Sequence, residues 1–167
     1  MINNNTLIIA EAGVNHNGSM SLAKEMIAVA ANAKANYVKF QSYKTEELLI
    51  KSAEKANYQK QNTIGDETQF KMLKKYELSI EDHHELIKEC KKYKINFLSS
   101  PFDISSAKML HNLDLKLFKI PSSEITNIPY LEFIGSLQKK IILSTGMSTL
   151  NEIELAVDVL KNSGTSN

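Results

Sequence analysis

The chain has 167 residues, which is enough for one domain that buries a core of its own. Its net charge of +1 argues against a strongly basic binder of nucleic acid or of a membrane surface, and 43% apolar residues argue against disorder. The single cysteine, Cys90, excludes an internal disulfide and fits a reducing compartment. Because the sequence has no signal-peptide pattern and no apolar run of ~18–20 residues, we expect a cytoplasmic protein.

Five short apolar segments, each bounded by polar residues, glycine or proline, predict strands. They cover residues 6–10, 36–41, 96–100, 115–120 and 140–144. The first is a continuous apolar run, as expected of a strand that is buried on both faces. Pro101 and Pro121 end the third and fourth strands.

Helical patterns separate these strands, and several have a capping residue at the start. Ser19 is the predicted cap of the first helix, and Asn127 caps a helix with Pro129 in its first turn. Two capping boxes begin helices. They are Ser79–Asp82 and Thr149–Glu152, and further helices are predicted over 67–76 and 103–113. Residues 42–66 are polar and lack a regular pattern.

Repeated strand–helix units predict a parallel α/β sheet, either doubly wound or a (β/α)8 barrel of the TIM type. Polar residues recur at the carboxyl end of every strand, as in barrel active sites. The first strand also lacks the glycine-rich fingerprint of a dinucleotide site. We therefore predict a barrel. A complete barrel has about 250 residues, so residues 1–167 would form roughly its first five units.

Lys39 and Lys119 end two mostly apolar strands, with serines near each. Each lysine alone fits two interpretations equally well. Its apolar stem is buried while its ammonium group reaches solvent, or its ammonium group contacts a ligand. Together, two cations and several hydroxyls predict a site for a small anion such as a phosphate or carboxylate. Glu11 and Glu124 are candidate acids or bases, or else structural partners of a lysine at this edge.

The histidines show no metal-binding spacing. His16 lies in the first loop, where it either donates to a substrate or is structural. His83 and His84 are adjacent on a helix and point about 100° apart, so we expect both to be solvated. Cys90 is expected in the core rather than as a nucleophile.

Six ordered motifs resemble the sialic acid synthase family, the N-acetylneuraminate synthases and their relatives. They are residues 8–19 (IIAEAGVNHNGS), 38–41 (VKFQ), Tyr58-Gln59 with Asn62, 98–103 (LSSPFD), 118–124 (FKIPSSE) and 142–147 (ILSTGM). The resemblance implies condensation of phosphoenolpyruvate with an N-acylated mannosamine-type sugar, which yields a nonulosonic acid and phosphate. Such products are precursors of capsule, lipopolysaccharide or flagellar glycans.

The resemblance also assigns roles to residues of this chain. Phosphoenolpyruvate contacts fall on Lys39, Gln41, Ser100, Lys119, Ser122 and Ser144. Glu11 would lie over the reacting centre and the sugar, while Asn62 and His16 are the further candidate sugar contacts. Glu124 would act in support, near substrate or metal-bound water.

Family enzymes use a divalent metal, Mn²⁺ or Mg²⁺, which would polarise the sugar aldehyde as phosphoenolpyruvate attacks it. The resemblance places the metal-ligand histidines beyond Asn167, together with the barrel remainder and an antifreeze-like domain that reaches into the partner subunit of a homodimer. We therefore expect no metal ligand in this chain, and an N-terminal portion of a synthase that is inactive alone.

Two alternatives remain open. One is a non-catalytic module that binds anions or serves assembly. The other is a related phosphoenolpyruvate-dependent sugar-phosphate synthase, against which the Asn15-His16-Asn17-Gly18 motif counts. The sequence does not distinguish N-acetylmannosamine from the sugar precursors of legionaminic or pseudaminic acid as the acceptor.

Overall fold

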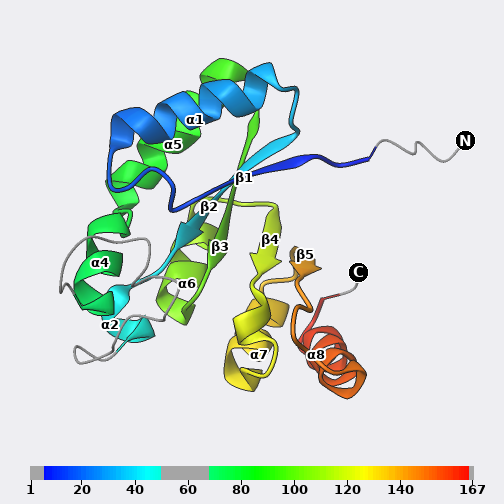
Figure 1. Cartoon of the computed structure of the whole chain (residues 1–167). Helices are drawn as coiled ribbons and strands as arrows, with labels where there is room; N and C mark the ends of the chain where they lie inside the picture. Colours follow the sequence, from blue (N-terminus) through cyan, green and yellow to red (C-terminus); the bar gives the residue numbers. More distant parts are fainter. Residues whose placement is uncertain (1–5, 50–67, 166–167) are drawn as a thin grey trace, which may run out of the picture.

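The computed structural model describes residues 6–49 and 68–165. Five strands and the helices between them alternate along this part of the chain, as the sequence predicts (Figure 1). The strands are β1 (Ile9–Gly13), β2 (Tyr37–Ser42), β3 (Asn96–Pro101), β4 (Leu117–Ile120) and β5 (Lys140–Leu143). The helices are α1 (Met20–Asn32), α2 (Thr45–Leu48), α4 (Gln69–Tyr76), α5 (Ile80–Tyr93), α6 (Ile104–Asn112), α7 (Ile128–Ser136) and α8 (Leu150–Asn162), with a 3-10 turn, η1 (Ser122–Glu124).

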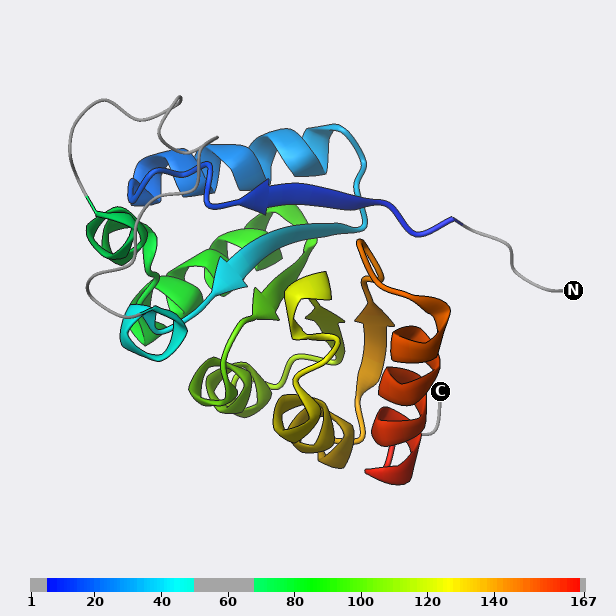
Figure 2. The same ribbon diagram turned by 60° about the horizontal axis from the view of Figure 1, so that its bottom comes forward.

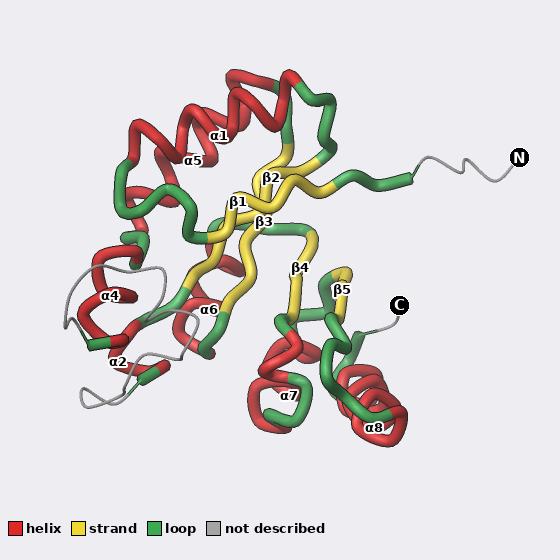
Figure 3. Tube along the Cα trace, in the orientation of Figure 1, coloured by secondary structure: helices red, strands yellow, loops and turns green. Residues whose placement is uncertain are grey.

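The strands follow one another in chain order, and every pair is parallel. One sheet has the order β1-β2-β3, and a second consists of β4 and β5, with β4 in contact with β3. Figure 2 shows the strands around an arc with helices on its outer side, and Figure 3 shows the same layers. A doubly wound sheet reverses its strand order at a switch point, whereas a barrel keeps it. The fold is therefore a partial (β/α) barrel, as predicted.

The first strand differs from the prediction. It begins at Ile9 and includes Glu11 and Gly13, whereas Leu7 and Ile8 lie before it and are 48% and 51% exposed. The expectation of burial on both faces is wrong, because Glu11 is exposed within β1 while Ala12 and Gly13 are buried. Among the described strands, β1 lies at the edge of its sheet beside β2. Parallel pairing of Glu11 with Lys39 extends the strand into the segment expected to be a loop.

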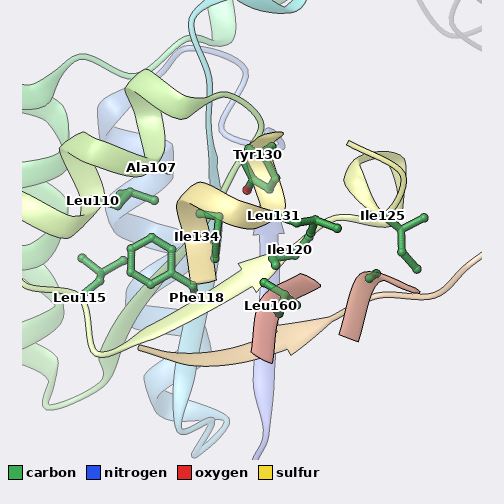
Figure 4. Close-up of a cluster of buried hydrophobic side chains, with 11 residues drawn as sticks. Ala107, Leu110, Leu115, Phe118, Ile120, Ile125, Tyr130, Leu131, Ile134 and Leu160 are labelled. Carbon is green, nitrogen blue, oxygen red and sulfur yellow. The ribbon is translucent and has the colours of Figure 1, made fainter. Parts of the chain in front are cut away.

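The larger core cluster lies between β4 and the helices around it. Phe118 and Ile120 of β4 are fully buried, and they pack with Leu110 of α6 and with Leu131 and Ile134 of α7 (Figure 4). A second cluster fills the space between α1, α5 and the outer face of β1–β3, where Cys90 is 1% exposed. The prediction that Cys90 is a core residue is confirmed.

Local signals at the helix ends are confirmed. Both predicted capping boxes form, and Asn127 accepts a hydrogen bond from the Tyr130 backbone amide with proline in the first turn. The short helix α2 was not predicted, because it depends on a carboxylate far along the chain, described below. No helix in the described part of the chain has both the length and the apolar character that a membrane crossing requires.

Candidate functional site

Three polar side chains from three strands meet on the inner face of the first sheet, opposite its helices. Lys39 Nζ lies 2.7 Å from Glu11 Oε2 and 3.3 Å from Ser100 Oγ. Register places them together, because Glu11 pairs with Lys39 across β1 and β2, and Gln41 pairs with Ser100 across β2 and β3. The Lys39 side chain is only 9% exposed, whereas that of Glu11 is 55% exposed.

A second lysine completes this face from the β4–β5 sheet. Lys119 Nζ donates to Ser144 Oγ and to the Ile120 carbonyl, the latter at 3.1 Å. Burial lowers the pKa of Lys119, the Lys39 ammonium lowers it further, and Glu11 opposes both. The two ammonium groups are thus near enough to repel each other, and a bound anion would relieve that repulsion.

Gln41 lies on the same face as Lys39, two residues further along β2. Gly13, at the end of β1, lies near Gln41. A β-carbon at position 13 would lie 3.4 Å from Glu11 Oε1 and 3.9 Å from Gln41 Nε2, and the φ of +55° there favours glycine. The structure therefore brings Glu11, Lys39, Gln41 and Ser100 together in the first sheet, and Lys119 beside Ser144 in the second. The roles of these residues toward a ligand stay predictions.

Two further predicted site residues, Ser122 and Glu124, lie in the turn η1 after β4 and have different surroundings. Ser122 is near the loop after β5, since its Oγ lies 3.5 Å from where a β-carbon of Gly146 would be. Glu124 accepts hydrogen bonds from Ser123 Oγ at 3.1 Å and from Asn127 Nδ2 at 2.8 Å, so it is held at the start of α7. Both of these partners are structural, and a role of Glu124 toward substrate stays a prediction.

The remaining sugar-contact candidates are not joined to this group. His16 is 1% exposed, and its ring lies 6.2 Å from that of Phe40 on the helix-covered face of β2. Its Nδ1 accepts the Gly18 amide, and burial lowers its pKa. This position favours the structural alternative for His16. Asn62 lies outside the described residues.

A buried hydrogen-bond network was missed by the sequence analysis. The prediction that His83 is solvated is wrong, because its side chain is 0% exposed and contacts Ser42 Oγ, which in turn contacts Ser99 Oγ. The neighbouring His84 is exposed, as predicted. One sequence signal pointed to this network. Ser42 and Ser99 follow and precede Gln41 and Ser100, so their side chains point to the opposite face of the sheet, which helices cover.

The inner face can bind a compact anion. It offers two cations, two hydroxyls and an amide beside a single carboxylate, and such charge-assisted contacts favour phosphate or carboxylate oxygens. An apolar cavity of about 400 Å³ between β1 and α1 borders Glu11 but is lined by residues such as Leu22 and Met26, so it does not serve this purpose. Within residues 6–49 and 68–165, no three His, Cys, Asp or Glu side chains gather as a metal site.

Comparisons with known proteins show which family the chain resembles. The chain is 55% identical over 159 residues to the N,N'-diacetyllegionaminic acid synthase of Campylobacter jejuni, covering 95% of this chain and 48% of that protein. It is 48% identical over 154 residues to the enzyme of the same name from Legionella pneumophila, covering 92% and 43%. The chain thus spans about half the length of the curated relatives it matches.

A solved structure is also similar. It is the N-acetylneuraminic acid synthetase of Leptospira borgpetersenii in complex with citrate, with 32% identity, a TM-score of 0.81, and coverage of 99% of this chain and 55% of that one. The model of the NeuB family matches residues 26–167. These matches confirm the resemblance seen in the six motifs. The chain therefore belongs to the NeuB family.

Proposed function

We propose that this chain supplies the phosphoenolpyruvate-binding part of a nonulosonic acid synthase. The observation that carries the proposal is that Lys39 and Lys119, on strands β2 and β4 of the two sheets, each contact a serine hydroxyl near a strand end, Ser100 and Ser144. Phosphoenolpyruvate carries a phosphate and a carboxylate, so two separate cations match its two charged ends. The relatives named as nonulosonic acid synthases support the reaction class.

Each side chain has a part in the proposed binding. Lys39 and Lys119 neutralise the phosphate and carboxylate, and the Ser100 and Ser144 hydroxyls and the Gln41 amide donate to their oxygens. Lys39 is held between Glu11 and Ser100 before any ligand arrives, which reduces the cost of orienting it. Ser122, in the turn after β4, is the further hydroxyl donor in this proposal.

The proposed reaction joins C3 of phosphoenolpyruvate to the aldehyde carbon of an open-chain N-acylated sugar. Water adds at C2, and phosphate leaves with cleavage of the C2–O bond to give the C2 ketone. Of the two protons that water releases, one goes to the former aldehyde oxygen and the other leaves on the phosphate. Glu11 contacts Lys39 and its side chain is half-exposed, which suits a group that takes up and returns a proton during this exchange. The described residues form no metal site, so we assign no step to a metal.

The acceptor we propose is the diacetamido-trideoxy sugar that leads to legionaminic acid. Two relatives at 55% and 48% identity carry that product in their names. In this proposal the complete enzyme is a cytoplasmic homodimer that supplies surface-glycan precursors, and it uses Mn²⁺ or Mg²⁺ held by residues outside this chain.

Calorimetric titration of the 167-residue chain with phosphoenolpyruvate tests the site. We expect Lys39→Gln and Lys119→Gln each to weaken binding by about 10- to 100-fold, because one hydrogen bond to a charged group is worth about 1.5–3 kcal/mol. Lys116→Gln is the matched control, since that lysine is 73% exposed and pairs with Asp114 before β4 begins. Equal affinity in all three variants would refute the anion site.

Turnover separates the synthase part from the alternatives. We expect no product from phosphoenolpyruvate and sugar with this chain alone, and activity when the downstream half of a relative is supplied. Efficient turnover by the isolated chain would refute the half-site. Equal affinity for phosphoenolpyruvate and inorganic phosphate, with no activity in the completed enzyme, would favour the non-catalytic anion-binding module.

A further inference from the structure

A buried hydrogen-bond network lies directly behind the anion site and takes no part in the function proposed above. His83 Nδ1 lies 2.6 Å from the Ser79 carbonyl oxygen, and His83 Nε2 lies 2.6 Å from Ser42 Oγ. Ser42 Oγ lies 2.7 Å from Ser99 Oγ. The network thus ties the first turn of α5 to the carboxyl ends of β2 and β3.

The directions of these hydrogen bonds follow from the groups present. The Ser79 carbonyl only accepts, so His83 Nδ1 carries the proton, and Nε2 of the neutral ring accepts from the Ser42 hydroxyl. Ser42 Oγ then accepts from the Ser99 hydroxyl. Burial lowers the pKa of His83, which keeps the ring neutral; the Ser79 bond and Asp82 raise that pKa, and Lys44 and His84 lower it.

A histidine beside a serine is also the arrangement of a nucleophile and its base, but access excludes that use. Ser42 is 1% exposed and His83 and Ser99 are 0% exposed, on the face that α5 covers. The ring also packs edge-on against Phe97, at 6.0 Å between centroids and 77° between planes. No substrate reaches this hydroxyl, so the network acts through what it holds in place.

Its members are the sequence neighbours of anion-site residues. Ser42 follows Gln41, and Ser99 precedes Ser100, while Gln41 and Ser100 are partners in the β2–β3 register. Adjacent strand residues point to opposite faces, so each serine hydroxyl on the outer face corresponds to one ligand group on the inner face. A shift of either serine would therefore displace its neighbour, Gln41 or Ser100, on the inner face.

We propose that His83 is a positioning residue, which through Ser42 and Ser99 sets the separation of Gln41 and Ser100 for binding of the phosphoenolpyruvate anion. The ligand in this inference rests on the proposed function, whereas the link between the two faces of the sheet does not. Binding sites tolerate displacements of only about 0.5 Å, so loss of a hydrogen bond behind the strands should lower the affinity for the ligand.

Four variants test this inference. His83→Phe keeps a ring but removes both nitrogens, and Ser42→Ala removes the hydroxyl that links helix to strands. His83→Gln restores an acceptor that can reach Ser42. His84→Gln is the matched control, because it changes the exposed neighbour on the same helix.

Two measurements are made on each variant: the affinity for phosphoenolpyruvate, and the NMR resonances of the Gln41 side-chain amide in the ligand-free chain. We expect His83→Phe and Ser42→Ala to weaken binding about 10-fold and to move the Gln41 signals in the same direction. His83→Gln should return both to within about 3-fold of the parent affinity, and His84→Gln should match the parent. Rescue by an acceptor is not expected of a residue that only fills space.

The Gln41 signals test the link between the two faces, and the affinity tests the positioning role. Unchanged Gln41 signals in Ser42→Ala refute the link, and this small substitution decides alone if His83→Phe does not fold. Moved signals with unchanged affinity refute the positioning role. If the parent chain binds no phosphoenolpyruvate, the proposed function fails, and the Gln41 signals across the four variants still confirm or refute the coupling of the two faces.

Discussion

Replacing Glu77 by glutamine would test how α2 is held against the rest of the chain. The Glu77 side chain is 10% exposed and follows α4. Its Oε2 accepts from the Thr45 backbone amide at 3.0 Å, from Thr45 Oγ1 at 2.8 Å and from Lys74 Nζ at 3.0 Å, while Oε1 accepts from Lys44 Nζ at 3.3 Å. This one carboxylate thus joins the start of α2 to the end of α4.

The expected loss of stability follows from the ionisation of the Glu77 carboxyl group. Burial by itself raises the pKa of Glu77, but the hydrogen bonds from Thr45, Lys74 and Lys44 outweigh it and lower the pKa from 4.5 to about 2. At about 1.4 kcal/mol per pH unit, this corresponds to about 3 kcal/mol of stability at neutral pH. The two lysines are 42% and 46% exposed, so solvent screens part of it and we expect about 2 kcal/mol for Glu77→Gln.

Urea unfolding followed by circular dichroism measures this difference at pH 7 and pH 3. Because the pKa is lower in the folded state, the stabilisation is complete above pH 4.5 and is lost as the pH falls toward 2. We expect the difference between parent and Glu77→Gln to fall to less than half by pH 3. Glu85→Gln is the control, with a carboxylate 48% exposed in an ion pair to Lys24 and an expected effect below about 1 kcal/mol. Equal stability of the parent and Glu77→Gln at pH 7 would refute the reasoning.

Three further predictions concern the fold. Gly18→Ala should lower the free energy of unfolding by about 1–3 kcal/mol in a urea titration, because φ is +78° there and a β-carbon would lie 2.5 Å from the Lys75 carbonyl oxygen; an unchanged midpoint would contradict this close approach. Cys90 should react with iodoacetamide only as the protein unfolds, because burial raises the pKa of its thiol to about 12; fast labelling of the folded chain at pH 7.5 would count against its burial. Burial lowers the pKa of both His16 and His83 below 6.5, so the free energy of unfolding should decrease as the pH falls below 6.5, and His83→Gln should remove part of that decrease. Parallel pH profiles of the parent and His83→Gln would show that folding does not lower the His83 pKa.

The sequence by itself determined the local structure. Apolar runs predicted all five strands to within a few residues, because a buried strand needs several apolar side chains close together in the sequence. The capping boxes at Ser79 and Thr149 began helices as predicted, since each needs only residues three positions apart. Polar residues at the strand ends also predicted the inner-face group around Lys39 and Lys119, because parallel strands bring those ends to one edge.

Only the tertiary structure decided which polar groups pair. The Lys39 contact with Glu11 spans 28 positions, the Ser42 contact with His83 spans 41, and the Thr45 contact with Glu77 spans 32. No local pattern encodes such distances, so His83 was expected in solvent and α2 was not expected at all. Burial of β1 likewise depends on what packs against its two faces, and there Glu11 stays exposed while Ala12 is buried. Periodicity says which side of an element is apolar, but what covers that side, and which charge meets which hydroxyl there, is settled only when distant segments pack.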